Sequence, residues 1–300
     1  MLLARTLVVV SVASAQSTRS ERASVVVSEI RAIECGASAR AADAPSLSWH
    51  GSPVQWAEWR IALGEQQVSS RIVVVRFDPR VVQLSLDLVN KGTAMGAWSL
   101  AQAPIDALVA LNAGQFTDAG PWGWVVHRGR EWQAPGVGTL AGALVIDGVG
   151  AARVVDATEI AGVRRAIVAI EAVQSYPTLI GADQTAPSHV CDAQTPDALL
   201  DRTHRDTRLA IGTLADGRVI VAMSRYAGAG TIAARLPIGP TTPEMAEVMR
   251  RLGATRALML DGGLSAQLLV RGDRAAKATQ WPGLRSVPLA LVGKVRQPDR

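Results

Sequence analysis

The sequence predicts a single α+β domain with a mixed β-sheet, a few packed helices and a β-rich first half. Short segments rich in Val, Leu and Ile recur through the first half of the chain, and one amphipathic helix is well delimited in the second half. Residues 49–292 contain no internal repeat and no long low-complexity linker, which favours one domain over two. With 300 residues and 48% hydrophobic content, the chain can bury a substantial core.

The expected strands are recognised by alternating polarity or by short runs of apolar, often β-branched residues. Asp147-Gly148 and Asp216-Gly217 are dipeptides typical of hairpin turns. The expected strands cover residues 54–63, 71–76, 81–89, 108–111, 140–146, 166–169, 209–214, 218–223, 257–260 and 264–270.

The predicted helix runs from Pro243 to Leu252. Thr242 is the expected N-cap, Pro243 suits the first helical position, and Gly253 ends the helix. A second helix is predicted over residues 101–108. The apolar stripe of the first helix, which must face a sheet, consists of Met245, Val248, Met249 and Leu252.

The N-terminus has the order of features of a signal peptide. Arg5 precedes an apolar stretch at residues 7–12 and an A-x-A cleavage motif at residues 13–15. We therefore expect a secreted or periplasmic protein, with a buried first strand as the alternative. The predicted divisions are a signal peptide (1–15), a tether or short lead-in element (16–48), the main domain (49–294) and a polar tail (295–300).

The two cysteines, Cys35 and Cys191, are far apart in sequence and form no C-x-x-C motif. Export permits a disulfide between them, and a pair of buried free thiols is the alternative.

The basic excess, 31 Lys and Arg against 26 Asp and Glu, suits anionic partners but forms no dense block, so we expect no nucleic-acid partner. No apolar run reaches the length of a membrane span, so we expect no transmembrane segment after signal cleavage. The four histidines are scattered, and the glycine-rich nucleotide motifs and G-x-S-x-G are absent. We expect no metal and no cofactor.

Three segments place polar residues at the ends of apolar strands, where a rigid backbone can present them to a ligand. They begin at Asn112, Arg208 and Asp261. Taken singly, each has an ordinary structural explanation: an Asx turn, a surface cation and a hairpin turn, respectively.

Together these segments resemble the phosphodiester glycosidase family. Residues 112–116 (NAGQF) look like its N-[AG]-G-x-[FY] motif, residues 174–179 (QSYPTL) like Q-[AS]-G-P-x-L, residues 208–212 (RLAIG) like R-x-x-[IV]-G, and residues 260–265 (LDGGLS) like L-D-G-G-x-S. The resemblance covers roughly residues 54–292. The sequence departs from the family pattern at Tyr176, Leu209 and Leu264, where Gly, Thr and Gly are usual, and the bulkier loop narrows the expected site.

The resemblance implies a substrate in which a sugar is joined through its anomeric oxygen to a phosphodiester. Asp261 would act as general base or positioning carboxylate, Arg208 would bind phosphate, and Asn112 would orient the ligand. No second carboxylate is evident in the motifs, and phosphate is already a good leaving group. The other expected substrate-binding residues are Gly114, Gln174, Ser175, Gly262, Gly263 and Ser265, the last three forming a phosphate cradle from backbone N–H groups and a hydroxyl.

Trp122, Trp124 and Trp132 follow the Asn112 segment and are candidates for a sugar platform, with packing under a long loop as the alternative. His204 lies near Arg208 and is a candidate site residue, with a solvated loop as the alternative. We thus expect an exported hydrolase of a glycosyl phosphodiester in envelope or extracellular glycan. The alternatives are a non-catalytic protein that binds phosphorylated glycan on the same loops, and an interaction scaffold, which would need none of these polar residues.

Overall fold

The computed structural model describes residues 27–38, 44–88, 98–138, 141–192, 200, 202–227, 236–273 and 275–297. The predicted signal peptide and its cleavage motif lie outside these ranges, as do parts of the predicted lead-in element and tail. Within the described ranges, no helix combines the length and apolar character needed to cross a membrane.

The largest sheet has seven strands, and all its neighbouring strands are antiparallel except the parallel pair β1 and β2. Its first strand comes from the predicted lead-in element. In spatial order the strands are β1 (Ser28–Ile30), β2 (Gln55–Leu63), β3 (Val68–Phe77), β15 (Val219–Tyr226), β14 (Leu209–Leu214), β16 (Ala254–Met259) and β13 (Thr178–Ile180).

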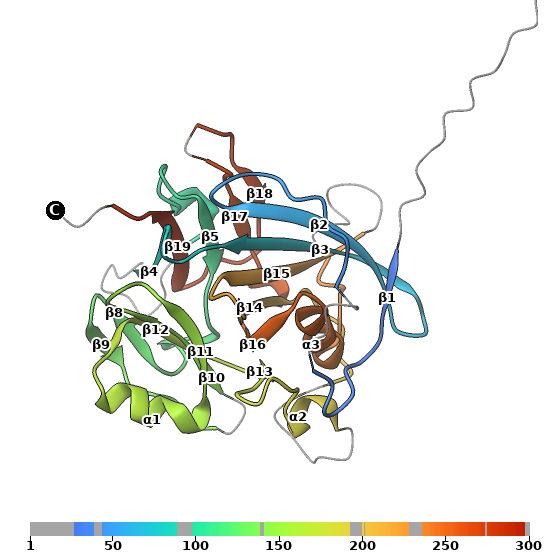
Figure 1. Ribbon diagram of the computed structural model, residues 1–300, viewed down its shortest axis with the longest axis horizontal. Helices are drawn as coiled ribbons and strands as arrows, with labels where there is room; N and C mark the ends of the chain where they lie inside the picture. The colour runs from blue at the N-terminus through green and yellow to red at the C-terminus, as the bar shows by residue number, and fades with distance from the viewer. Residues whose placement is uncertain are drawn as a thin grey trace, which may run out of the picture.

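The described residues also form two five-stranded antiparallel sheets and a small hairpin (Figure 1). The second sheet has the order β18 (Thr279–Trp281), β17 (Leu268–Val270), β5 (Val109–Asn112), β19 (Leu289–Val295) and β4 (Val82–Leu88). The third has the order β11 (Ala152–Asp156), β10 (Gly142–Asp147), β12 (Ala169–Ser175), β8 (Val125–His127) and β9 (Arg130–Gln133). The hairpin consists of β6 (Phe116–Thr117) and β7 (Gly120–Pro121).

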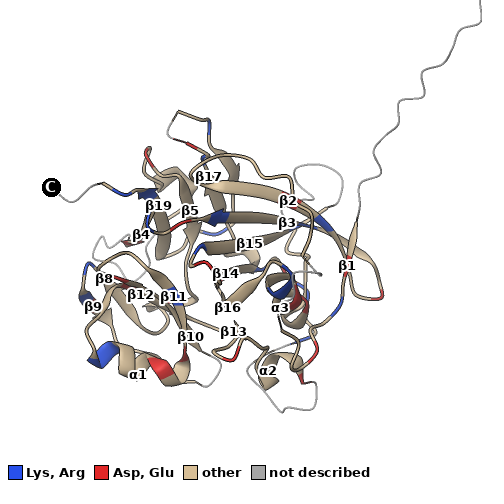
Figure 2. Ribbon diagram, viewed as in Figure 1, with Lys and Arg blue, Asp and Glu red and all other residues tan. Residues whose placement is uncertain are grey.

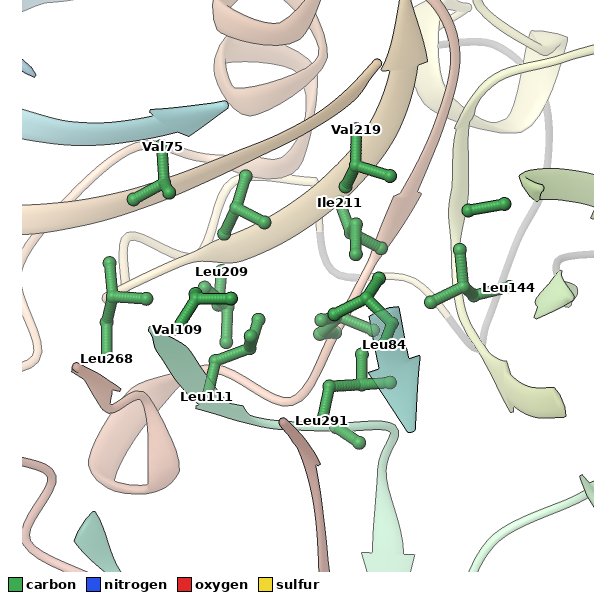
Figure 3. Packing of buried hydrophobic residues seen from close by; sticks show 14 of the residues in the cluster. Val75, Leu84, Val109, Leu111, Leu144, Leu209, Ile211, Val219, Leu268 and Leu291 are labelled. Carbon is green, nitrogen blue, oxygen red and sulfur yellow. The ribbon is translucent and has the colours of Figure 1, made fainter. Parts of the chain in front are cut away.

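The main core lies between the seven-stranded sheet and the second sheet. Figure 3 shows Val75, Leu209 and Ile211 of the large sheet facing Val109 and Leu111 of β5, with β4, β17, β19 and the third sheet also contributing side chains. All these strands hold alternating or continuous aliphatic residues, so burial of their apolar surface fixes the sheets against each other. The segment that carries Asn112 is thereby anchored in the core.

In the described part of the chain, three short helices accompany the sheets: α1 (Ala157–Arg165), α2 (Ser188–Cys191) and α3 (Thr242–Arg251). Met245 and Val248 of α3 pack against the other face of the large sheet, which forms a second core (Figure 1). This confirms the predicted helix, although the N-cap is Thr241, one residue earlier than expected, with Glu244 completing a capping box. The predicted α+β, β-rich class is confirmed, with the strands divided among several sheets.

The predicted helix over residues 101–108 is wrong. Only the 3₁₀ turn Leu100–Gln102 forms, and Ala103 has extended backbone dihedrals (φ −59°, ψ 133°) because Pro104 follows it. The predicted strand 264–270 is likewise shorter: Gly263–Ser265 is a 3₁₀ turn and β17 begins at Leu268.

Of the predicted strand 166–169, residues 166–168 are not in a strand, because the chain is leaving α1 there and β12 begins at Ala169. Helix α1 is not among the elements predicted from the sequence, and its capping box pairs Asp156 with Glu159. The expected hairpins at Asp147-Gly148 and Asp216-Gly217 are present between β10 and β11 and between β14 and β15. A disulfide joins Cys35 to Cys191 and ties the N-terminal segment to α2.

Basic and acidic residues are interspersed along the described chain. Figure 2 shows blue segments on β9, α1, α3 and β19, and red segments beside the blue ones on α1 and α3. In α3, for example, Glu247 pairs with Arg250 and Arg251, with N–O distances of 2.6 Å for both.

Candidate active site

A cavity of about 280 Å³ opens where the four sequence motifs converge. The N–H of Asp261 donates to the carbonyl of Ala113 (3.0 Å), and the N–H of Gly263 donates to the carbonyl of Thr207 (2.7 Å). These bonds hold the loop after β16 between the end of β5 and the start of β14. The lining includes Gln115, Tyr176, Pro177, Arg208, Asp261, Gly262 and Gly263 from the motifs, together with His204, Asp206 and Thr242.

Asp261 has a carboxyl group whose pKa lies well above its ordinary value. Burial raises its pKa to about 6, and the negative charge of Asp206 acts in the same direction. The Ser265 hydroxyl and the Gly262 N–H donate hydrogen bonds to the carboxylate, and Arg285 attracts it, but these effects do not offset burial. A carboxyl with a pKa near 6 changes protonation state close to neutral pH, as a general acid or base must.

Asp206 is a second carboxylate in this cavity and was not among the site residues predicted from the sequence. Its Oδ1 accepts a hydrogen bond from the Thr207 N–H (2.7 Å), and its Oδ2 lies 3.8 Å from Nε2 of His204. A methyl group added at Gly263 would lie 3.0 Å from Asp206 Oδ2, so the glycine loop packs directly against the carboxylate. Its position two residues before Arg208, in a polar stretch, could have identified Asp206 as a candidate site residue from the sequence.

Arg208 lies in the cavity wall, as expected for a phosphate-binding residue. Its Nε donates to the carbonyl of Pro240 (3.1 Å) and its Nη2 to the carbonyl of His204 (2.7 Å). Its backbone N–H donates to Ser224 Oγ (2.7 Å). The bonds from Nε and Nη2 hold the planar guanidinium in one orientation within the wall.

Asn112, which was expected to orient the ligand, is not among the residues that line the cavity. It is fully buried, its Nδ2 donates to the carbonyl of Asp261 (2.7 Å), and its Oδ1 accepts from the N–H of Gln267 (2.9 Å). Asn112 therefore positions the Asp261 loop.

The donors of the expected phosphate cradle have partners within the protein. The Gly263 N–H is bonded to the Thr207 carbonyl, while the Gly262 N–H and the Ser265 hydroxyl are directed at the Asp261 carboxylate. Gly262 is needed for close approach, because a Cβ there would lie 2.5 Å from the Thr207 carbonyl oxygen, and Gly263 has a positive φ of 55°. The donors of Gly262 and Ser265 therefore bind the Asp261 carboxylate.

Gln115 and Tyr176 form another wall. Gln115 Nε2 donates to the Tyr176 carbonyl (2.6 Å), and its Oε1 accepts from the Tyr176 N–H (3.1 Å). Ser175 Oγ lies 2.5 Å from Gln115 Oε1 and 2.5 Å from the Met259 carbonyl oxygen. Ser175 thus fixes the wall from behind and does not line the cavity, and the sequence analysis gave Gln115 no role.

Gln174 and Gly114 are structural in this arrangement. Gln174 Oε1 accepts from the N–H groups of Trp124 and Gly136, both at 2.8 Å. A Cβ at Gly114 would lie 2.4 Å from the Gln174 carbonyl oxygen, so only glycine allows the two segments to approach so closely. Neither residue lines the cavity, contrary to the substrate-binding roles expected for them.

The three tryptophans do not form one platform. Trp124 is 1% exposed and its indole N–H donates to Glu131 (3.0 Å), which supports packing under a loop. Trp132 is exposed beneath the Arg130 guanidinium. Trp122 packs edge to face against Tyr176, with ring centroids 4.9 Å apart, and is thus connected with the cavity wall.

Comparisons with known proteins agree with this geometry. Residues 106–292, more than half of the chain, match the family model described as phosphodiester glycosidase. A search of curated protein sequences found no match. The catalytic domain of zebrafish N-acetylglucosamine-1-phosphodiester alpha-N-acetylglucosaminidase, auto-inhibited by its pro-peptide, has a similar fold, with 17% identity, a TM-score of 0.58 and coverage of 88% of each chain.

Two further solved structures share the fold. A hypothetical protein from Synechocystis has 16% identity and a TM-score of 0.54, and the alignment covers 85% of this chain but only 65% of the Synechocystis chain. A candidate exported protein from Burkholderia pseudomallei has 18% identity and a TM-score of 0.51, with 76% and 74% of the two chains covered. Since the matched family region contains all four motifs that converge on the cavity, the chain belongs to the phosphodiester glycosidase family.

Proposed function

We propose that the protein is an exported hydrolase that cleaves the link between a sugar and a phosphodiester in envelope or extracellular glycan. One observation carries the proposal: a carboxyl with a pKa of about 6, Asp261, lies in one cavity with a second carboxylate, Asp206, and with the guanidinium of Arg208. Such a cavity offers a group that moves a proton and a cation that binds phosphate.

In the proposed reaction, water adds across the glycosyl–phosphate bond. The sugar leaves with a hydroxyl group and the other product is a phosphate monoester, so that atoms and charge balance with one proton released near neutral pH. Asp261 in its ionised form accepts the proton of water or of a sugar hydroxyl. Burial keeps the pKa of Asp261 raised, and the negative charge of Asp206 adds to this effect. Phosphate is a stable anion when it leaves, so strong acid assistance is unnecessary.

Two features support the remaining parts of the proposal. The Trp122–Tyr176 pair offers an aromatic edge with polar groups, which suits one face of a sugar ring. The Cys35–Cys191 disulfide is typical of proteins that fold in an oxidising compartment, and the similar Burkholderia protein is described as a candidate exported protein.

The proposal is tested by hydrolysis of a panel of sugar 1-phosphodiesters that varies the sugar and the group beyond the phosphate. Asp261→Asn is compared with Asp216→Asn. Asp216 is also followed by glycine, but it lies in the hairpin between β14 and β15. We expect turnover by the parent, a loss of about a hundredfold or more in Asp261→Asn, and no loss in Asp216→Asn. Binding without turnover across the panel would instead favour a phosphoglycan-binding protein, and equal rates for the parent and Asp261→Asn would exclude Asp261 as the proton-transfer group.

A further inference from the structure

The N-terminus of α3 meets the cavity at Thr242. This helix has ten residues, and the N–H groups of its first turn have no intrahelical acceptor. The N-cap Thr241 side chain accepts from the Glu244 N–H (3.4 Å), and Pro243 has no N–H. The Thr242 N–H is therefore the first-turn donor that hydrogen-bonds neither within the capping box nor within the helix. Thr242 also lines the cavity.

The Thr242 side chain is the second, independent observation. Thr242 is fully buried, and within the described part of the chain its Oγ1 has no hydrogen-bond partner. A buried hydroxyl without a partner destabilises a fold, and valine would fill the same volume without that cost. Because Thr242 is also one of the residues that line the cavity, its unpartnered hydroxyl favours a ligand there that accepts its hydrogen bond.

The cavity also contains the carboxyl groups of Asp206 and Asp261, but the groups at its α3 end attract an anion. Arg208 lies in the same wall, and its Nε is bonded to the carbonyl of Pro240, just before the α3 N-cap. The carboxylate of Glu244 in the first helical turn is neutralised by Arg205, at 2.6 and 2.9 Å. The positive end of the helix dipole, a hydroxyl, a backbone N–H and a guanidinium thus act together.

We propose that Thr242, the N-terminus of α3 and Arg208 form the phosphoryl subsite of the cavity, an inference that rests on the proposed function. The Thr242 hydroxyl and N–H donate to phosphate oxygens, and Arg208 supplies the charge. The phosphate binds at the α3 end, and the sugar carbon that bears it lies toward Asp261. This replaces the glycine cradle expected from the sequence, whose donors are engaged elsewhere.

The test measures binding, which does not depend on turnover. Isothermal titration with N-acetylglucosamine 1-phosphate, glucose 1-phosphate and the two unphosphorylated sugars compares the parent, Thr242→Val, Thr242→Ser and the control Thr279→Val on β18. We expect Thr242→Val to weaken binding of the sugar phosphates about tenfold or more and to leave binding of the free sugars unchanged. Thr242→Ser, which keeps the hydroxyl, and Thr279→Val should bind as the parent does.

Melting temperatures distinguish a ligand-binding role of the Thr242 hydroxyl from a structural one, because a structural role predicts a lower melting temperature for Thr242→Val. Removal of an unpartnered buried hydroxyl should leave the melting temperature of Thr242→Val equal to or above that of the parent, and inorganic phosphate should raise it less than it raises that of the parent. A marked decrease or a failure to fold would mean that the hydroxyl is used by the fold, which overturns the proposal.

Three binding results would also overturn it: unchanged sugar phosphate affinity in Thr242→Val, equal loss for phosphorylated and free sugars, or no preference of the parent for the phosphorylated forms. The subsite and the proposed function fail separately. A parent that binds sugar phosphates through Thr242 but hydrolyses no phosphodiester keeps the subsite and refutes the enzyme. A parent that turns over substrate with no contribution from Thr242 does the reverse.

Discussion

Replacing Asp261 by Asn should stabilise the protein at alkaline pH while it lowers turnover by about a hundredfold or more. Burial raises the pKa of Asp261 from 3.8 to about 6, so ionisation of this carboxyl opposes folding. A pKa raised by this amount lowers the free energy of unfolding at alkaline pH by about 3 kcal/mol, since each pKa unit corresponds to about 1.4 kcal/mol. Asn has nearly the same shape, stays neutral, and can still accept hydrogen bonds from Ser265 and Gly262.

The pH dependence follows from the sign of the displacement. Between the unfolded and folded pKa values, the folded state binds the proton and the unfolded state releases it, so the parent loses stability relative to Asp261→Asn as pH rises from about 4 to about 6. Above pH 7 the difference is complete, and at pH 4 most of it has disappeared. About 3 kcal/mol corresponds to a melting temperature roughly 6 °C higher at pH 8.

The assay is urea unfolding of both proteins at pH 4 and pH 8. Asp216→Asn is the matched control, because Arg218 holds the pKa of the Asp216 carboxyl below its usual value, so its removal must not stabilise the protein at pH 8. The reasoning is refuted if Asp261→Asn is less stable than the parent at pH 8, or if the difference between them is the same at both pH values.

The remaining predictions concern the site and its supports. In the parent, kcat/KM should fall below pH about 6 as Asp261 is protonated, and a flat pH–rate profile would count against its role as base. Arg208→Lys keeps the charge but loses the planar fork, so titration should show about tenfold weaker binding of N-acetylglucosamine 1-phosphate; equal affinity would argue against contact. Asn112→Ala removes two buried hydrogen bonds, so the free energy of unfolding should fall by about 2 to 4 kcal/mol, with loss of turnover; activity at parental rates would show that the loop does not need this support. Replacing Cys35 and Cys191 by Ala opens a loop closed over a separation of 156 residues, and the free energy of unfolding should fall by about 2 to 4 kcal/mol, which urea titration of the non-reduced proteins measures.

The sequence predicted which segments converge on the cavity, because polar motifs that follow apolar strands are carried there by the core. The strands before Asn112 and Asp261 and after Arg208 are anchored by residues such as Leu111 and Leu209. The local sequence pattern was sufficient to predict α3, because its N-terminal cap and its apolar stripe indicate the same helix. The pattern failed at residues 101–108, because Pro104 restricts the backbone of Ala103 to an extended conformation despite the helical spacing of apolar residues.

The use of individual polar groups could not be predicted, since it depends on which backbone groups meet across strands distant in sequence. Gly263 looked like a phosphate donor until the structure placed the Thr207 carbonyl 2.7 Å from its N–H. The same pairing brings Asp206 against the loop and makes it the second carboxylate. Asn112 was identified as a site residue, but its support of the Asp261 loop became visible only in three dimensions.

The central claim is that Asp261 and Arg208 act on one sugar phosphate in this cavity, and a crystal structure of Asp261→Asn soaked with N-acetylglucosamine 1-phosphate tests it most directly. We expect the phosphate to contact Arg208 and Thr242, with the sugar carbon that bears it facing residue 261 and the ring near Tyr176. A ligand bound outside the cavity, or bound with its phosphate turned away from Arg208 and the α3 N-terminus, would contradict the account.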